Sequence, residues 1–337
     1  MILHSTHASV AILNESTSQP IASTPCTKRT DILRQARSGQ NRKRRQQVLG
    51  SQRLLYGYSI HGRDSNGVID YSELFRRLAN LESTSRLLSL RDDFIVSFKE
   101  MTLVDSVWEV RMLFGDRTES ITLWDVDADR ERDDAKAKGE IVARSTHLYL
   151  DPVSRFAGIE RRRPGLSPGD IGLALSRIGP QIGFGRDLVI DFTPVAAESF
   201  TDELLAFTRI RQASVSLTRP NFDWSDNANQ LTGYAGQSNG QYVEIEVSAK
   251  RGESLSPETG IVADIKNLAQ NPISPLRGVR VRGTYASEPG ERSLSLNSHQ
   301  ERESFSVGGD GEVPTWVRMR AAGLSLIRRL RNSNASE

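Results

Sequence analysis

The acidic pair Glu244 and Glu246 is the first feature of the sequence that could do chemistry. Alternate residues of a strand share one face, so the two carboxylates would stand side by side as in metal-dependent nucleases, with Asp264 as a third acid. Such nucleases also hold a lysine close to the second acid on the same strand face, whereas Lys250 follows Glu246 by four residues. A half-exposed strand gives the same alternation without chemistry, so both interpretations stay open.

A second candidate is the segment 62–73, which resembles the calcium loop of an EF-hand from its third position onward. Its first position is Gly62, which brings no carboxylate, and a strand precedes it where an EF-hand requires a helix. A hairpin-like turn into a capped helix explains the same residues. We therefore expect no calcium site here, and no metal or cofactor elsewhere. The residues at ligand positions are Asp64, Asn66, Asp70 and Glu73.

Clustered arginines give a third possibility, contact with nucleic-acid phosphates. Arg280 and Arg282 would share one strand face. Two further clusters are our candidate nucleic-acid-binding residues: Arg42, Lys43, Arg44 and Arg45, and Arg161, Arg162 and Arg163. A solvated surface balanced by acids is the alternative for all of them. No catalytic residue is assigned.

The charge of the chain is unevenly distributed. The 337 residues carry a formal net charge of +2, but residues 1–50 hold eight Lys or Arg against two acids, so the remainder is mildly acidic. The first 50 residues lack apolar periodicity and are expected to be a disordered basic tail. The single cysteine, Cys26, excludes an internal disulfide framework. No apolar run is long enough to span a membrane, and a cytoplasmic protein is expected.

Hydrophobic periodicity predicts the elements that must position these residues. Helices are expected over 70–82, from 168, over 199–208 and 257–270, and at the C-terminus, among many short strands. This pattern predicts an α+β fold of mixed sheets with packed helices, in lobes 51–195 and 196–337. Strands 242–247 and 279–285 flank a helix and are expected to be parallel neighbours. Glu244 and Glu246 would then pair with Arg280 and Arg282.

The stretch from Leu55 to Arg163 resembles a group of poorly characterised bacterial and prophage proteins. This group is similar to the RexA-like and KwaB-like phage-exclusion proteins. In the group's returning strand a glutamine is usual, and Glu160 takes its place here. The matching segments are Leu55–Tyr58, Tyr71–Phe75, Trp108–Arg111, Leu148–Pro152 and Ile159–Arg161, and the later segments Ile261–Lys266 and Val281–Gly283 are also similar.

The resemblance implies a bacterial accessory protein of phage-defence or mobile-element type that binds duplex DNA and forms a homodimer. The leading hypothesis is therefore a nucleic-acid-associated protein without enzymatic activity. The first alternative is a metal-dependent nuclease that uses Glu244, Glu246 and Asp264. The second is a protein-interaction subunit that does not contact nucleic acid.

Overall fold

The structure is a computed structural model that describes residues 51–65, 67–125, 130–134, 140–218, 242–286, 289–308 and 313–335. Residues Gly50–Glu337 cluster as one compact unit. The expected basic tail, with Arg42, Lys43, Arg44 and Arg45, lies outside the described residues.

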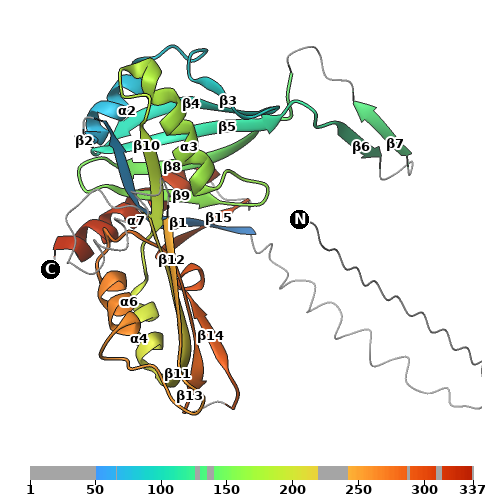
Figure 1. Cartoon of the computed structure of the whole chain (residues 1–337). Helices are drawn as coiled ribbons and strands as arrows, with labels where there is room; N and C mark the ends of the chain where they lie inside the picture. The colour runs from blue at the N-terminus through green and yellow to red at the C-terminus, as the bar shows by residue number, and fades with distance from the viewer. Residues whose placement is uncertain are drawn as a thin grey trace, which may run out of the picture. The chain divides into compact units, whose positions relative to one another are not determined.

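A large antiparallel sheet makes up the first half of this unit (Figure 1). Its strands are β1 (Ser51–Asp64), β2 (Gly67–Val68), β3 (Leu87–Arg91), β4 (Phe94–Val104), β5 (Val107–Asp116), β8 (Arg144–Asp151), β9 (Phe156–Arg161), β10 (Val189–Pro194) and β15 (Arg302–Val307). The order is β10-β1-β9-β8-β5-β4-β3, and β15 and β2 also pair with β1. The long β1 thus joins segments from both ends of the described chain.

Helices cover both faces of this sheet. They are α2 (Tyr71–Asn80), α3 (Pro168–Ile178), the 3-10 turn η1 (Gly179–Ile182) and α7 (Thr315–Ala335). α2 and α3 bury Phe75 and Ile171 in the core on one face, whereas α7 places Leu326 and Leu330 in a separate cluster on the other. α7 can approach closely because Gly158 presents no side chain; a Cβ there would lie 3.3 Å from Leu326 Cδ2.

A smaller antiparallel sheet follows, with two helices on one side (Figure 1). Its core joins Val215 and Val281 of the sheet to Val262 and Ile265 of a helix. The elements are α4 (Glu198–Leu205), β11 (Phe207–Thr218), β12 (Tyr242–Ser248), α6 (Ile261–Gln270), β13 (Leu276–Tyr285), β14 (Arg292–Ser295) and the turn η2 (Leu296–Ser298). Their order in the sheet is β12-β11-β13-β14.

This order corrects one expectation. β12 and β13 are parallel to each other, because both pair antiparallel with β11, but they are not neighbours. Local periodicity gave the strand–helix–strand unit correctly, and it carried no information on which strand fills the space between.

The segment 125–138 is rich in charged residues. Where the structure describes it, it contributes to a hairpin of β6 (Ile121–Asp125) and β7 (Arg130–Asp134). Charged residues have low strand propensity, but five consecutive register pairs supply backbone hydrogen bonds that do not depend on side-chain type.

The fold class is α+β, as the sequence predicts. The expected lobe boundary at 195–196 falls between β10 and α4, and both β15 and α7 lie C-terminal to it and pack on β1. No helix within the described ranges is both long and apolar enough to cross a bilayer.

Candidate functional site

The smaller sheet has one apolar and one polar face, and β11 shows the alternation most clearly. Ala213, Val215 and Leu217 are buried against the helices. The intervening residues Gln212, Ser214 and Ser216 therefore face away from the helices, on the side that no helix among the described residues covers. The middle of this outer face is thus uncharged and rich in hydrogen-bonding groups.

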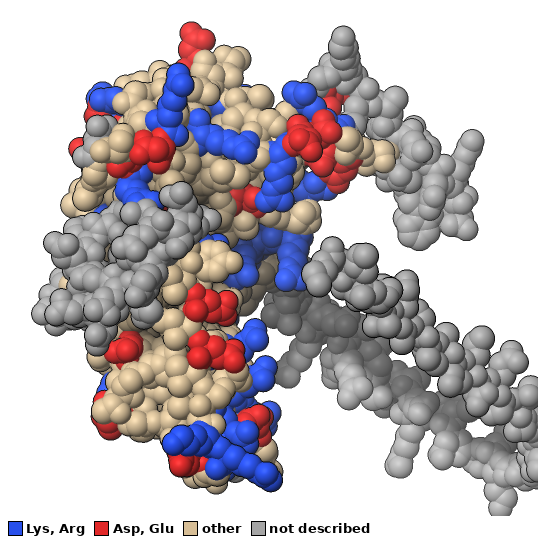
Figure 2. Space-filling model, viewed as in Figure 1, with Lys and Arg blue, Asp and Glu red and all other residues tan. Residues whose placement is uncertain are grey.

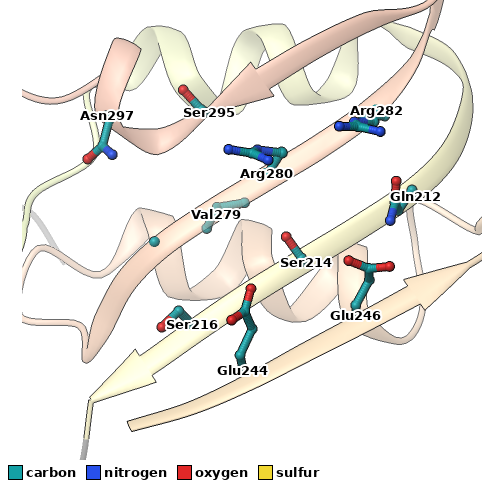
Figure 3. Close-up of a pocket in the computed structure, with 11 residues that line it drawn as sticks. Gln212, Ser214, Ser216, Glu244, Glu246, Val279, Arg280, Arg282, Ser295 and Asn297 are labelled. Atoms are coloured by element: carbon teal, nitrogen blue, oxygen red, sulfur yellow. The ribbon is translucent and has the colours of Figure 1, made fainter. Parts of the chain in front are cut away.

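Charged side chains flank β11 on both sides. Ser214 lies opposite Glu246 of β12 and also opposite Arg280 of β13. Figure 3 shows both glutamates and both arginines on the same side of the sheet, with the β11 side chains between them. Together they line a groove of about 330 Å³, which we call the polar groove: Gln212, Ser214, Ser216, Glu244, Glu246, Arg280, Arg282, Ser295 and Asn297.

The acidic and basic sides of the polar groove do not neutralise each other by direct contact. Two strand spacings of about 4.8 Å separate β12 from β13, so their backbones lie about 10 Å apart. Among the ion pairs that join described residues, none includes Arg280 or Arg282. In Figure 2, acidic side chains lie over β12 and basic ones toward β13 and β14. The predicted pairing of these arginines with Glu244 and Glu246 is therefore wrong.

The structure does not bring Asp264 to the two glutamates. Asp264 lies in the first turn of α6, and α6 packs on the apolar face of the sheet, whereas Glu244 and Glu246 project from the polar face. Lys250 follows the end of β12 and is exposed. Within the described part of the chain, no group of three or more His, Cys, Asp or Glu side chains could hold a metal ion.

The arginine run 161–163 lies at the end of β9, beside the start of β1. Arg161 lies over the Tyr56 ring, with 5.3 Å from its guanidinium carbon to the ring centroid. Arg162 Nε donates to the Pro164 carbonyl at 3.4 Å, and Arg163 is exposed. Figure 2 shows basic side chains gathered in this region. The run is accessible, but Arg161 is partly held by the aromatic ring.

The segment that resembles a calcium loop is a hairpin followed by a capped helix. Asp64 pairs with Gly67 in the β1–β2 hairpin, and Asn66 lies outside the described residues. The Asp70 carboxylate accepts the Glu73 amide at 3.0 Å and caps α2. Glu73 itself is bonded by Arg76 and Arg77. Hydrogen bonds and charges of these arginines lower the pKa of Glu73. The Asp70 and Glu73 side chains thus stabilise the helix, and the interpretation as a hairpin followed by a capped helix is confirmed.

A second polar cluster lies on the larger sheet, and no pattern in the sequence indicated it. Glu160 is fully buried, and its carboxylate accepts from Arg53 at 3.0 Å and from His147 Nδ1 at 2.8 Å. Burial alone raises the pKa of Glu160, but the hydrogen bonds and charges of His147 and Arg53 outweigh it and hold the pKa below its usual value. Arg53 is 107 residues from Glu160 in sequence, so no local pattern joins them.

The molecule is thus an α+β protein whose second sheet has a polar, charge-separated face that no helix within the described ranges covers. The chain belongs to the family defined by a domain of unknown function, DUF4747, which matches residues 55–271. The match includes Glu244 and Glu246 and ends before Arg280 and Arg282. No curated protein matches the chain. None of these findings connects it with RexA-like or KwaB-like proteins, so that resemblance stays a prediction.

Proposed function

We propose that this protein binds nucleic acid through the polar groove and acts without catalysing a reaction. The observation that carries the proposal is the pair Arg280 and Arg282, exposed at alternate positions of β13 and without an ion-pair partner among the described residues. Arg53, Arg111 and Arg320, by contrast, each have a carboxylate oxygen within 3.0 Å. The guanidinium groups of Arg280 and Arg282 can therefore bind phosphate oxygens.

The acidic side of the polar groove, on β12, suits the base of a nucleotide. Carboxylates accept hydrogen bonds from base amino groups, so Glu244 and Glu246 can contact base edges while Arg280 and Arg282 hold the backbone. Ser214 and Ser216 lie between the two and can bond the sugar. The carboxylates repel phosphates, which orients the strand with its backbone toward β13.

This arrangement favours single strands over duplexes. Base edges that form Watson–Crick pairs are accessible only when the bases are unpaired. The arginine run 161–163 can add phosphate contacts, which require no particular base. Duplex binding, which the resemblance implies, would depend on this run rather than on the polar groove.

The test is a fluorescence anisotropy titration of the full chain with labelled single-stranded and duplex oligonucleotides over a range of salt. For single strands, each phosphate contact contributes about 0.7 to the slope of log affinity against log salt. The double substitution Arg280→Ala with Arg282→Ala should lower that slope by about 1.4. The triple alanine variant of Arg161, Arg162 and Arg163 should chiefly weaken duplex binding.

A matched control removes the same charge elsewhere. Arg251 follows β12 and Arg328 lies on α7; both are exposed and neither lines the polar groove. Their double alanine variant should keep the slope of the unmodified protein. Absence of binding at low salt, or an equal loss in the control, would refute the proposal. Magnesium-dependent cleavage that disappears in Glu246→Gln would favour the nuclease alternative.

A role in phage exclusion in the bacterial cytoplasm is part of this proposal and rests on the family resemblance described above. A protein that holds single strands without cleaving them fits such a role, because replicating phage genomes expose single-stranded segments in that compartment.

A further inference from the structure

A pocket of about 350 Å³ lies between the outer face of β4, β5 and β8 and the start of α7. It is separate from the polar groove and shares no residue with it. Its floor is the Tyr149 ring, which is almost fully buried because α7 lies directly against it. At Gly323 of α7, a Cβ would approach the Tyr149 ring to 2.5 Å. The pocket volume lies in the range of small-molecule sites.

His147 presents a single polar atom to this pocket. Its Nδ1 is bonded to the buried Glu160, whose lowered pKa keeps the carboxylate ionised and therefore the acceptor. An imidazole that donates from Nδ1 has a lone pair on Nε2 when it is neutral and an N–H there when it is protonated. His147 lines the pocket, its side chain is 22% exposed, and no hydrogen bond from a described residue reaches Nε2. Nε2 is therefore an oriented hydrogen-bonding atom for a ligand.

The charged groups of the pocket wall already have partners. Arg320 donates two hydrogen bonds of 2.6 Å to Glu109, and Arg111 lies 2.5 Å from Glu100. A charged ligand would have to displace one member of a pair, and an uncharged ligand would not. The charges of the wall therefore select for a neutral molecule.

One flat apolar surface completes the pocket. Trp316 begins α7 and is 56% exposed, with the Arg320 guanidinium carbon 5.1 Å from its ring centroid. An exposed indole that is held in place on one side can stack a planar ring on its accessible surface.

From these three features we infer that the pocket binds an uncharged planar heterocycle with a hydrogen-bonding edge, the chemistry of a nucleobase. The ring would stack on Trp316 and form a hydrogen bond with His147 Nε2. The base can belong to a free nucleoside or to a strand, and the inference does not depend on the polar groove.

The test is an NMR titration of the full chain, labelled with ¹⁵N-histidine, with each of the four common ribonucleosides. At least one nucleoside should shift the His147 Nε2 signal in a saturable way. Loss of one base–aromatic stack should weaken binding at least about fivefold in Trp316→Ala. Because Trp316 is exposed, this variant should still fold. The spectrum of His147→Gln lacks the His147 signal and so assigns it. The same variant should no longer bind the nucleoside.

Two controls make the outcome decisive. His299 forms a similar pair with Glu203 at 2.9 Å outside the pocket, and His299→Gln should leave nucleoside binding unchanged. The Arg280→Ala, Arg282→Ala protein should also bind nucleosides normally, which separates this inference from the proposed function. An oligonucleotide that binds at this site more tightly than its nucleoside would identify a strand as the source of the base. The absence of a saturable shift, or unchanged affinity in Trp316→Ala, would overturn the inference.

Discussion

The two sheets of this protein carry the same kinds of charged side chain on their outer faces and use them differently. In the larger sheet, Glu100 of β4 and Arg111 of β5 are register partners on adjacent strands, and their side chains lie 2.5 Å apart. In the smaller sheet, Glu246 and Arg280 are both register partners of Ser214, so one strand separates them. A single intervening strand changes a neutralised pair into two separate charges.

The comparison shows that residue type and alternation do not decide whether a charged face is structural or available to a ligand. Strand order decides it. Adjacent strands place opposite charges within ion-pair distance, whereas alternate strands leave them about 10 Å apart with their remaining hydrogen-bonding capacity unused. The larger sheet adds a third case, because Glu160 is fully buried and its partners Arg53 and His147 are half-buried.

The largest effect is expected where a buried charge loses a partner. In Arg53→Met, Glu160 would lose Arg53 and keep His147 as a partner. Breaking a buried ion pair typically costs 3–5 kcal/mol, and we expect about 3 kcal/mol because His147 still donates. Urea denaturation at pH 7 measures the loss. Arg111→Met is the matched control; its partner Glu100 is exposed, and the cost should stay below about 1 kcal/mol.

The pH dependence of stability gives a second measurement on the same pair. The pKa of Glu160 is lower in the folded protein than in the unfolded chain, so its contribution is present above the ordinary glutamate pKa and is lost as pH falls through the folded value. The unmodified protein should therefore lose more stability on acidification below about pH 4.5 than Glu160→Gln does. Equal slopes, or an equal loss in Arg53→Met and Arg111→Met, would contradict a buried ionised Glu160.

Much of this fold is encoded locally and could be predicted. The spacing of Leu74, Phe75 and Leu78, with Asp70 as cap, predicted α2 almost to its ends. Alternation placed Glu244 and Glu246 on the face opposite the core. Both inferences depend only on residues within a few positions of each other, where helix and strand periodicity act directly.

The elements of the candidate sites that could not be predicted are long-range. No periodicity in β12 or β13 indicates that β11 lies between them, because strand order depends on the packing of the whole sheet. In the sequence, Glu160 is notable only because it replaces the glutamine that is usual in the resembling group. Its role is visible in the structure, where folding brings Arg53 and His147 to its carboxylate. Burial of a carboxylate is a property of the tertiary structure.

A substitution at Ser214 can supply the missing neighbour in the smaller sheet. Ser214→Glu places a carboxylate directly opposite Arg280, as Glu100 lies opposite Arg111 in the larger sheet. The new pair should remove Arg280 as a phosphate contact and weaken single-strand binding about tenfold, the cost of one charge-assisted hydrogen bond. Anisotropy titration measures it, and Ser214→Gln, of the same size without the charge, should change affinity less than twofold. Equal effects of the two substitutions would mean that bulk and not charge matters at this position.

The smallest effect is expected from two parallel charge-reversal cycles, one in each sheet. The first combines Glu100→Arg with Arg111→Glu, and the second combines Glu246→Arg with Arg280→Glu. Directly opposed charges on adjacent strands contribute about 0.2–1 kcal/mol, so the first double variant should recover part of the stability that its single variants lose.

In the second cycle the charges interact through solvent across about 10 Å. Coulomb's law in water then gives about 0.4 kcal/mol, and screening at physiological salt reduces it further. The stability losses of the two single variants should therefore sum to the loss of the double variant, to within the few tenths of a kcal/mol that independent sites show. Urea denaturation of all six variants at one salt concentration measures both couplings. A coupling in the second cycle as large as in the first would mean that Glu246 and Arg280 meet across Ser214 in solution. Arg280 would then be neutralised like Arg111, and the phosphate contact on which nucleic-acid binding rests would be lost.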